Sequence, residues 1–280
     1  MNQGVLYVVA TPIGHLDDFS PRACAVLRSV SRILAEDTRH SARLLQHYAI
    51  DTPMMALHEH NEQSEADHCL QVLMEGRDLA LISDAGTPLI SDPGYRLVRL
   101  CQEQGIKVSP IPGASAMVAA LSVAGLASDR FVFEGFLPAR STARRERLMS
   151  LGREERTLIF YEAPHRVAAC LQDMLDVWGD RKVCLCRELT KQFETVRLDG
   201  LVALTAWVHA DPMQQRGELV LVVEGASAAD QLDSKEDLRV LDALLAVLPM
   251  RQAVDLAVEI RGGRRNWFYS QALDRQQDRS

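Results

Sequence analysis

Short apolar runs alternate with helical patterns through the first 125 residues, and this alternation restricts the fold more than any other feature. Val5–Ala10 is a short continuous apolar run, which is typical of a strand covered on both faces. Ser20-Pro21 then supplies an N-cap followed by proline at the first helical position. Repeated units of this kind predict a mostly parallel sheet with helices on both faces. The predicted strands are Val5–Ala10, Arg32–Asp37, Met54–Leu57, Asp78–Ser83 and Lys107–Ile111, and the further helices are Ser41–Tyr48, Ser64–Glu75, Tyr95–Glu103 and Ala114–Val123.

The pattern changes around Leu126–Arg130, where a second α/β region begins. Val183–Leu189 and Glu194–Leu198 are close enough in sequence to form an antiparallel pair, which predicts a more mixed sheet. We therefore predict an N-terminal α/β domain over 1–125, a second α/β domain over 126–225, and a linker with a small C-terminal helical module over 226–280. The remaining predicted elements are the strands Phe131–Phe136, Arg156–Tyr161 and Glu218–Val223, the helices Ser141–Leu151 and Pro164–Val177, the linker Ala226–Asp233 and the helical region Leu238–Leu273.

The overall charge is acidic, with 31 Lys plus Arg against 38 Asp plus Glu and a formal net charge of −7. A protein whose whole surface binds nucleic acid would be basic, so any contact with phosphates in this protein must come from local basic patches. The sequence has no run of apolar residues long enough for a transmembrane helix and no basic, signal-like N-terminus. We expect a cytoplasmic protein.

Cysteines and histidines do not predict a metal site or disulfides. The six cysteines form no CxxC pair, which favours reduced thiols. His58-Glu59-His60 has the spacing that places two imidazoles on one side of a strand, but no third ligand is evident nearby. We therefore predict no bound metal.

Three turn-rich loops each follow a predicted strand of the first domain: Thr11-Pro12-Ile13-Gly14, Ser83–Pro88 and Ile111–Ser115. Loops after parallel strands share the carboxyl edge of the sheet, where ligands bind. Asp84 and Ser115 offer hydrogen-bond acceptors for a ribose or an amine. Each loop alone is explained equally well by turn chemistry, but three at one edge predict a ligand cleft. The sequence lacks the GxGxxG motif of dinucleotide-binding folds. It also lacks the P-loop motif GxxxxGK followed by Ser or Thr, so neither of these phosphate-binding loops is expected.

A second polar cluster, Glu36-Asp37-Thr38-Arg39, ends the second predicted strand. Paired acids before an arginine can orient a polar substrate or accept a proton as a general base. The alternative is a helix start in which Asp37 or Thr38 caps the following helix. The position at the ligand edge favours a functional role.

Two segments of the second domain also carry polar residues where predicted strands end: Tyr161–Arg166 and Arg187–Lys191. His165 is more often a structural residue than a base in such a place. Arg166, Arg187 and Lys191 could meet phosphates. The alternative for each is a solvated surface position or an ion pair.

Together these segments resemble the tetrapyrrole methylase superfamily, and within it the ribosomal RNA small subunit methyltransferase I family. The motifs that carry the resemblance are LYVVATPIG, AEDTR, ISDAGTPLISDPG, PGASA, FEGFLP, YEAPHR and REL. The resemblance extends from Gly4 to about Gly225 and is weaker beyond. The chain departs from the family's usual TPIGNL at His15, where asparagine is expected, although histidine can also donate or accept a hydrogen bond.

The resemblance implies two α/β domains of the tetrapyrrole methylase fold with S-adenosylmethionine in the cleft between them, and usually a homodimer. It also implies methyl transfer to the ribose 2′-oxygen of a cytidine in 16S ribosomal RNA, near the decoding centre of the small ribosomal subunit. Matched by motif, the implied cofactor contacts are Pro12, Asp84, Thr87, Ser115, Ala116, Glu162 and the backbone near Gly217.

A methyl transfer from S-adenosylmethionine mainly requires the protein to align a hydroxyl oxygen with the methyl carbon. A ribose 2′-hydroxyl is a poor nucleophile until its proton is removed or strongly hydrogen-bonded. The candidate proton acceptors are Glu36, Asp37 and Glu188. The candidates to lower the hydroxyl pKa or to hold phosphates are Arg39, Arg187 and Lys191.

Two other functional classes stay open. One is a corrin or porphyrin methylase of the same fold, whose anionic substrate would also suit arginines. The other is a non-catalytic ribosome-binding module that keeps the fold. Methyl transfer to small ribosomal subunits would identify an RNA methyltransferase, whereas methyl transfer to tetrapyrroles would identify a corrin or porphyrin methylase. A lack of cofactor binding would favour the non-catalytic ribosome-binding module.

The C-terminal helices are predicted to form an RNA-contacting module. The helical patterns on either side of Gly262-Gly263 resemble a helix-turn-helix. Arg264 and Arg265 precede Trp267 and Phe268, and such a mixture suits phosphate contact with base stacking. In the alternative, the two aromatic side chains pack onto the second domain or a dimer partner.

Overall fold

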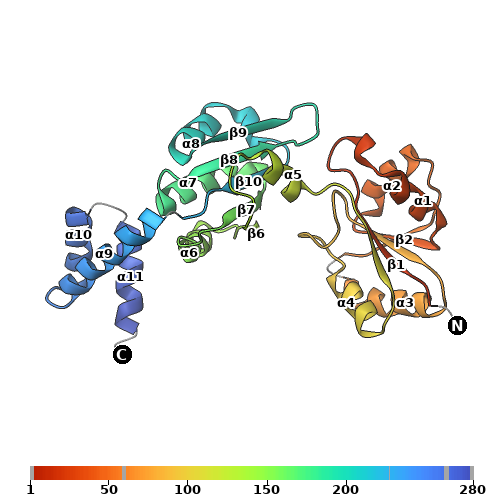
Figure 1. Cartoon of the computed structure of the whole chain (residues 1–280), viewed down its shortest axis with the longest axis horizontal. Coiled ribbons are helices and arrows are strands. Elements are labelled where there is room, and N and C mark those ends of the chain that lie inside the picture. The colour runs from red at the N-terminus through yellow and green to blue at the C-terminus, as the bar shows by residue number, and fades with distance from the viewer. Residues whose placement is uncertain (1–2, 59–60, 227, 262–264, 278–280) are drawn as a thin grey trace. The chain divides into compact units, whose positions relative to one another are not determined.

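The structure is a computed structural model that describes residues 3–58, 61–226, 228–261 and 265–277. The chain divides into two compact units. The first is Met1–Ala119 together with Glu188–Glu194, and the second is Ala120–Arg187 together with Thr195–Ser280. Each unit contains one five-stranded sheet with helices packed on it (Figure 1).

The sequence predicts a mostly parallel first sheet, and all four of its strand pairings are parallel, with the strand order β3-β2-β4-β1-β5. Successive side chains of a strand point to opposite faces. Leu79 and Leu81 therefore pack in the core beneath α3 and α4, whereas Ala80 and Ile82 pack in the core beneath α1 and α2. The strands are β1 Leu6–Val9, β2 Arg32–Ala35, β3 Met54–Ala56, β4 Leu79–Ile82 and β5 Val108–Ile111, and the helices are α1 Pro21–Ser29, α2 Thr38–His47, α3 Glu62–Met74, α4 Tyr95–Glu103 and α5 Ala116–Val123.

Helix α4 receives its N-terminal cap from another helix. Its own N-cap residue is Gly94, which has no side chain to accept a hydrogen bond. The buried carboxylate of Glu62, in α3, accepts hydrogen bonds from the N–H groups of Arg96 at 2.7 Å and Leu97 at 3.4 Å. A carboxylate at this end of a helix is further favoured by the helix dipole.

We expect Glu62→Ala to lower the free energy of unfolding of the first unit by about 1–2 kcal/mol, the usual cost of losing a helix cap. Two helical N–H groups would lose their acceptor beneath α4. Thermal unfolding followed by circular dichroism measures the loss. Asp67→Ala, an exposed acid in the same helix, is the matched control. Equal melting temperatures for the two variants would show that the cap contributes nothing.

The second sheet is mixed, as predicted, with the order β6-β7-β10-β8-β9. Strands β6 and β7 are parallel, and β10 runs antiparallel to both β7 and β8. The predicted antiparallel pair is β8 with β9. One face is covered by α6, α7 and α8, whose Leu148, Leu171 and Leu204 share a core with Leu185 and Leu221. The strands are β6 Phe131–Phe136, β7 Thr157–Glu162, β8 Lys182–Arg187, β9 Thr195–Gly200 and β10 Leu219–Val223, and the helices are α6 Ser141–Ser150, α7 Val167–Trp178 and α8 Leu201–Ala210.

The C-terminal part is a bundle of α9 Ala228–Leu245, α10 Met250–Arg261 and α11 Arg265–Gln277. Helix α9 begins at Ala228, so the prediction of a linker over Ala226–Asp233 is wrong for most of its length. Phe268 is 1% exposed and packs in the core of this bundle with Leu241 and Val254. None of the helices in the described part of the chain is long and apolar enough to span a membrane.

Candidate functional site

Four polar loops meet at the carboxyl edge of the first sheet. Residues 11–14 follow β1, residues 36–39 follow β2, residues 83–88 follow β4, and residues 112–115 follow β5. Because all five strands are parallel, these strand ends lie at one edge, as the sequence predicts.

Hydrogen bonds between the loops after β1, β4 and β5 join them into one rim. The N–H of Thr11 donates to the carbonyl of Gly86 at 2.9 Å, and the N–H of Gly86 donates back to Thr11 at 3.1 Å. Thr87 Oγ1 donates to the carbonyl of Ala114 at 2.9 Å. Gly86 has a φ of +85°, and a Cβ there would lie 3.3 Å from Ile13 Cγ2, so the close approach of these loops favours glycine.

Asp84 connects this rim to the loop after β2. Its Oδ1 accepts a hydrogen bond from the N–H of Asp37 at 3.2 Å. Asp37 in turn caps α2, because its Oδ1 accepts from the N–H of Arg39 at 2.8 Å and of His40 at 3.4 Å. The hydrogen bond from the Arg39 backbone is the main cause that lowers the pKa of Asp37. Asp37 therefore caps α2, which is the alternative role considered for it in the sequence. A general-base role for Asp37 stays a prediction.

The loop between β4 and α4 adds an acid that the sequence patterns do not single out. Leu89 and Ser91 adopt left-handed backbone, with φ of 71° and 69°, a conformation that costs non-glycine residues energy and is often found at functional sites. Asp92 follows directly. Its burial, and then the nearby carboxylates of Glu36 and Asp84, raise its pKa to about 6, while a hydrogen bond with Ser83 acts in the opposite direction. An Asp-Pro-Gly sequence indicates only a turn, so local sequence offered no signal.

We expect Asp92→Asn to stabilise the free protein at neutral pH but not in acid. The pKa of Asp92 is raised from 3.8 to about 6 in the folded protein, so folding favours the protonated carboxyl and this part of the stability is lost as the pH rises through that range. The amide cannot ionise and avoids the loss. Melting temperatures at roughly pH 8 should be higher for the variant than for the wild type, and the two should converge near roughly pH 4. A difference that is the same at both pH values would contradict the assignment, and the exposed Asp67→Asn is the control.

A segment from between β8 and β9 also belongs to the first unit. We call this segment, Glu188–Glu194, the strap. Thr190 Oγ1 accepts a hydrogen bond from the N–H of His15 at 3.1 Å. A Cβ on Gly14 would lie 2.5 Å from Lys191 Cγ and 2.6 Å from Thr190 Oγ1. The strap therefore packs directly against the loop after β1.

The strap has a constrained backbone. Glu188 and Thr190 have positive φ values of 50° and 65°. The ammonium of Lys191 lies 2.9 Å from Glu188 Oε1, and the N–H of Thr190 donates to Glu194 Oε2 at 2.7 Å. Such contacts hold a strained conformation in place. They bring Glu188 and Lys191, two predicted site residues, beside the loop that contains Pro12.

The side chain of His15 has a local role. Its Nδ1 accepts a hydrogen bond from the N–H of Asp17 at 3.3 Å and caps the short helix Leu16–Asp18. An asparagine oxygen is also a preferred acceptor at an N-cap. The departure from the usual asparagine at this position is therefore compatible with the same local structure.

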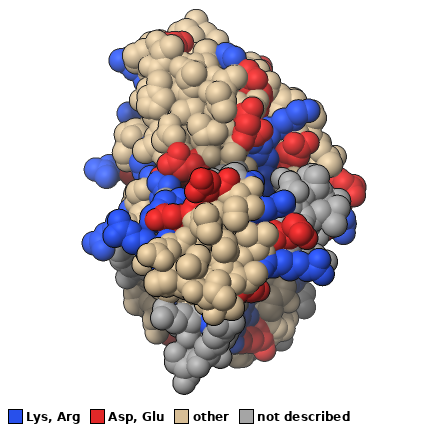
Figure 2. All heavy atoms as spheres, turned by 90° about the vertical axis from the view of Figure 1, so that its left-hand side faces the viewer, with Lys and Arg blue, Asp and Glu red and all other residues tan. Residues whose placement is uncertain are grey.

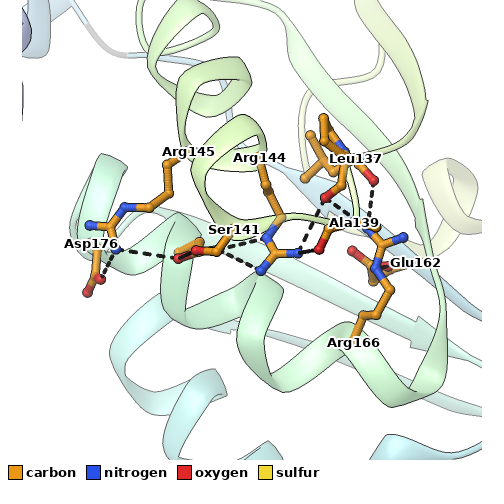
Figure 3. Close-up of polar contacts among 10 residues, drawn as sticks. Leu137, Ala139, Ser141, Arg144, Arg145, Glu162, Arg166 and Asp176 are labelled. Carbon is orange, nitrogen blue, oxygen red and sulfur yellow. Dashed lines mark hydrogen bonds and ion pairs between the residues drawn. The ribbon is translucent and has the colours of Figure 1, made fainter.

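Glu162 lies beside Arg166 in the second unit (Figure 3). Its side chain is 0% exposed, and its Oε1 lies 3.1 Å from Arg166 Nε. The same oxygen accepts a hydrogen bond from the N–H of Ala163 at 2.8 Å. Burial, followed by the neighbouring Glu162 carboxylate, raises the pKa of the Cys170 thiol. Within this unit Glu162 pairs with Arg166 and accepts a hydrogen bond from the backbone of Ala163. Direct contact of Glu162 with the cofactor stays a prediction.

The predicted basic residues differ in how accessible they are. Arg187 is buried and donates from Nη2 to Thr195 Oγ1 at 3.1 Å. Arg265 Nε lies 2.6 Å from Asp255 Oδ1, whereas Arg39 is almost fully exposed and 3.5 Å from Asp37. Arg264 lies outside the described residues. Phosphate binding by Arg265 would have to compete with Asp255 and stays a prediction. Figure 2 shows one face of the molecule, on which arginine and lysine are interspersed with acids.

The described residues contain no group of three or more His, Cys, Asp or Glu arranged to hold a metal ion. Of the His58-Glu59-His60 segment considered above, His58 is described, whereas Glu59 and His60 lie outside the described residues. The remaining predicted residues divide by unit: Pro12, Glu36, Asp37, Arg39, Asp84, Thr87, Ser115, Ala116, Glu188 and Lys191 are in the first, and Glu162, Arg187, Gly217 and Arg265 are in the second.

The sequence matches the family of Tetrapyrrole (Corrin/Porphyrin) Methylases over residues 5–204 and the RsmI C-terminal HTH domain over residues 231–276. It is 58% identical to Ribosomal RNA small subunit methyltransferase I of Pseudomonas aeruginosa, over 99% of both chains. It is 51% identical to the Escherichia coli protein of the same name, over 98% of this chain and 96% of that one. Among solved structures it is similar to uroporphyrin-III-C-methyltransferase from Thermus thermophilus, with a TM-score of 0.54, 18% identity, and coverage of 79% of this chain and 94% of that one.

Proposed function

Because the chain belongs to the ribosomal RNA small subunit methyltransferase I family of tetrapyrrole methylases, we propose that it methylates the ribose 2′-oxygen of a cytidine in 16S ribosomal RNA, near the decoding centre. It is an S-adenosylmethionine-dependent methyltransferase. The observation that carries the proposal is 58% identity over 99% of both chains to a relative named Ribosomal RNA small subunit methyltransferase I. The porphyrin-methylating neighbour is only 18% identical and supports the fold alone.

The rim of the first sheet fits this cofactor. S-adenosylmethionine supplies a methyl group activated by a positively charged sulfonium. Glu36, Asp84 and Asp92 place negative charge at the rim, and Asp92 is partly neutral when nothing cationic is near. The two hydrogen bonds between the backbones of Thr11 and Gly86 hold the loops after β1 and β4 together, so these loops offer a ligand one fixed arrangement. The residues we propose to hold the cofactor are Pro12, Asp84, Thr87, Ser115 and Ala116, with Glu162 and Gly217 from the second unit.

The protein's chemical task is to hold the 2′-hydroxyl in line and to receive its proton. We propose Glu36, Glu188 and Asp92 as the acceptors. In the protein without ligand, burial and the neighbouring carboxylates raise the pKa of Asp92 to about 6, so its carboxylate is there a stronger base than that of an ordinary aspartate. Asp37 is the weakest candidate of the acids at this edge, because its carboxylate is engaged as a helix cap and its pKa is lowered.

The substrate is proposed to be the small ribosomal subunit rather than a free nucleoside. A net charge of −7 gives little general attraction for a polyanion. Binding must then depend on individual arginine and lysine side chains that contact RNA already folded in the small subunit. Arg39 and Lys191 at the edge of the first sheet, with Arg187, Arg264 and Arg265 elsewhere in the sequence, are the proposed RNA contacts. A cytoplasmic location follows from this substrate.

A homodimer is also proposed. Strand β9 lies at an edge of the second sheet, and its Val196 and Leu198 are exposed, as is Val202 at the start of α8. Exposed apolar side chains along an edge strand are typical of surfaces that another chain covers. Sedimentation should give twice the mass of one chain, and a single-chain mass would contradict the dimer.

The direct test is transfer of a labelled methyl group from S-adenosylmethionine to isolated small subunits, followed by nucleoside analysis of the RNA. The proposal predicts labelled 2′-O-methylcytidine from small subunits and much less from free cytidine. Label in a tetrapyrrole substrate and none in RNA would favour the corrin or porphyrin alternative. Absence of S-adenosylmethionine binding by calorimetry would favour the non-catalytic module.

A further inference from the structure

Three aromatic side chains gather near the end of β6, an edge strand of the second sheet. The ring centroids of Phe133 and Tyr161 lie 4.9 Å apart, and those of Phe136 and Tyr161 lie 5.7 Å apart, both edge to face. Phe136 is 55% exposed, whereas Phe133 and Tyr161 are partly buried. We call these three residues the aromatic cluster. Phe136 is its outermost ring.

A β-bulge brings Phe136 to this side of the sheet. The register between β6 and β7 shifts between Phe133 and Gly135, and Gly135 has a φ of 64°. In a regular strand, residues three apart point to opposite faces. Here Phe133 lies opposite Ile159 and Phe136 lies opposite Tyr161, so both phenylalanines are on the face away from α6, α7 and α8.

The segment that follows Phe136 is held by two arginines (Figure 3). Arg166 Nη2 donates to the carbonyls of Leu137 at 2.6 Å and Pro138 at 3.2 Å. Arg144 Nη1 donates to the carbonyls of Pro138 at 3.4 Å and Ala139 at 3.2 Å. The carbonyl oxygens of the three residues that directly follow Phe136 therefore all accept hydrogen bonds from arginine side chains.

Each arginine is positioned by a buried carboxylate. Arg144 Nε lies 2.7 Å from Asp173 Oδ2, and Ser141 Oγ also donates to that oxygen, at 2.9 Å. Arg166 pairs with Glu162 at 3.1 Å. The Arg144–Asp173 pair is buried and hydrogen-bonded, and such a pair keeps one geometry. The backbone that presents Phe136 is thus ordered before any partner arrives, which reduces the entropy cost of binding.

We propose that the aromatic cluster is a stacking surface for a nucleobase of the RNA substrate, with Phe136 as the contacting ring. The inference rests on the proposed function. Single-stranded or splayed RNA bases stack on aromatic side chains regardless of sequence. Arg140 is exposed and directly follows the held carbonyls, where it can meet the adjoining phosphate. Phe136 and Arg140 are both exposed and are separated in the chain only by the segment whose carbonyls are held, and an aromatic ring with a cation so near in sequence fits a nucleotide better than an apolar protein surface.

The test measures methyl transfer to isolated small subunits by Phe136→Ala, Phe136→Trp and Phe131→Ala. Loss of one base stack should raise the KM for small subunits about 10- to 100-fold in Phe136→Ala. Tryptophan keeps a stacking face and should stay close to wild type. Phe131, exposed at the other end of β6, is the matched control and should also be unchanged. Cofactor affinity by calorimetry and the melting temperature should be the same in all variants.

An unchanged KM in folded Phe136→Ala would overturn the stacking surface, while wild-type activity on small subunits would leave the proposed function standing. A raised KM accompanied by loss of the wild-type oligomer would overturn it too, because a second copy of the chain would then be the occupant. If the wild-type enzyme itself transfers no methyl group to small subunits, the proposed function fails and this inference fails with it.

Discussion

Asp84→Ala should weaken S-adenosylmethionine binding about 10- to 100-fold, as expected for losing one charge-assisted hydrogen bond of about 1.5–3 kcal/mol. Methyl transfer to small subunits should fall at least as far. Asp84 is on the loop after β4 and contributes negative charge near Glu36 and Asp92. It also accepts the hydrogen bond from the Asp37 N–H that joins two loops of the rim. Calorimetry with the purified variant measures the affinity directly.

Asp84→Asn separates the two contributions of this side chain. The amide keeps an oxygen that can accept from Asp37 but removes the negative charge. If the charge matters, the asparagine variant should bind nearly as weakly as the alanine variant. If the loop connection matters, it should bind nearly as well as wild type. Wild-type affinity in a folded Asp84→Ala would remove Asp84 from the proposed cofactor site.

Gly14→Ala should lower methyl transfer about 100-fold, the scale of loss caused by displacing reacting groups by about 1 Å. A methyl group there would lie 2.5 Å from Lys191 Cγ and 3.1 Å from the carbonyl oxygen of Leu189. The strap would have to move away from the loop after β1 and take the carboxylate of Glu188 with it. Turnover of small subunits measures the effect.

Gly105→Ala is the matched control for this change. Gly105 has a φ of +67° but nothing within 4 Å of the added carbon. This variant should be strained in its backbone and still active, whereas Gly14→Ala should be folded and nearly inactive. Full activity in Gly14→Ala would show that contact between the strap and this loop is not needed for catalysis.

The sequence predicts the first domain well because its signals are local. Ser20 Oγ caps α1 as expected, accepting from the N–H of Ala23 at 3.0 Å. Gly or Pro lies close to the ends of β1, β3 and β5, and the alternation of strands with helices allows few topologies other than a parallel sheet. Once that topology is known, the meeting of the polar loops at one edge follows without further information.

Structural features that depend on contacts between residues far apart in the sequence cannot be predicted from local sequence patterns. Helix α8 was not predicted, and its second N–H is capped by Asp180 Oδ1 at 2.8 Å, 22 positions away. The hydrogen bond between His15 and Thr190 joins residues 175 positions apart. The raised pKa of Asp92 depends on Glu36. Each is a tertiary contact that leaves no periodic pattern in the sequence.

Residues with two reasonable explanations were the least predictable. Asp37 is at the ligand edge, and the structure also shows it as a helix cap. The sequence predicts that Phe268 stacks on RNA or packs onto the second domain or a dimer partner, whereas it is buried within the C-terminal bundle itself. Local composition cannot separate these alternatives, because an acid before a helix and an aromatic residue within one serve both purposes.

The most direct test of the central claim is nucleoside mass spectrometry of 16S ribosomal RNA from cells with and without this protein. We predict that one cytidine near the decoding centre carries a 2′-O-methyl group only when the protein is present. The wild-type gene should restore the modification, and Asp84→Ala should not. Identical 2′-O-methylcytidine content in RNA from both cells would contradict the account.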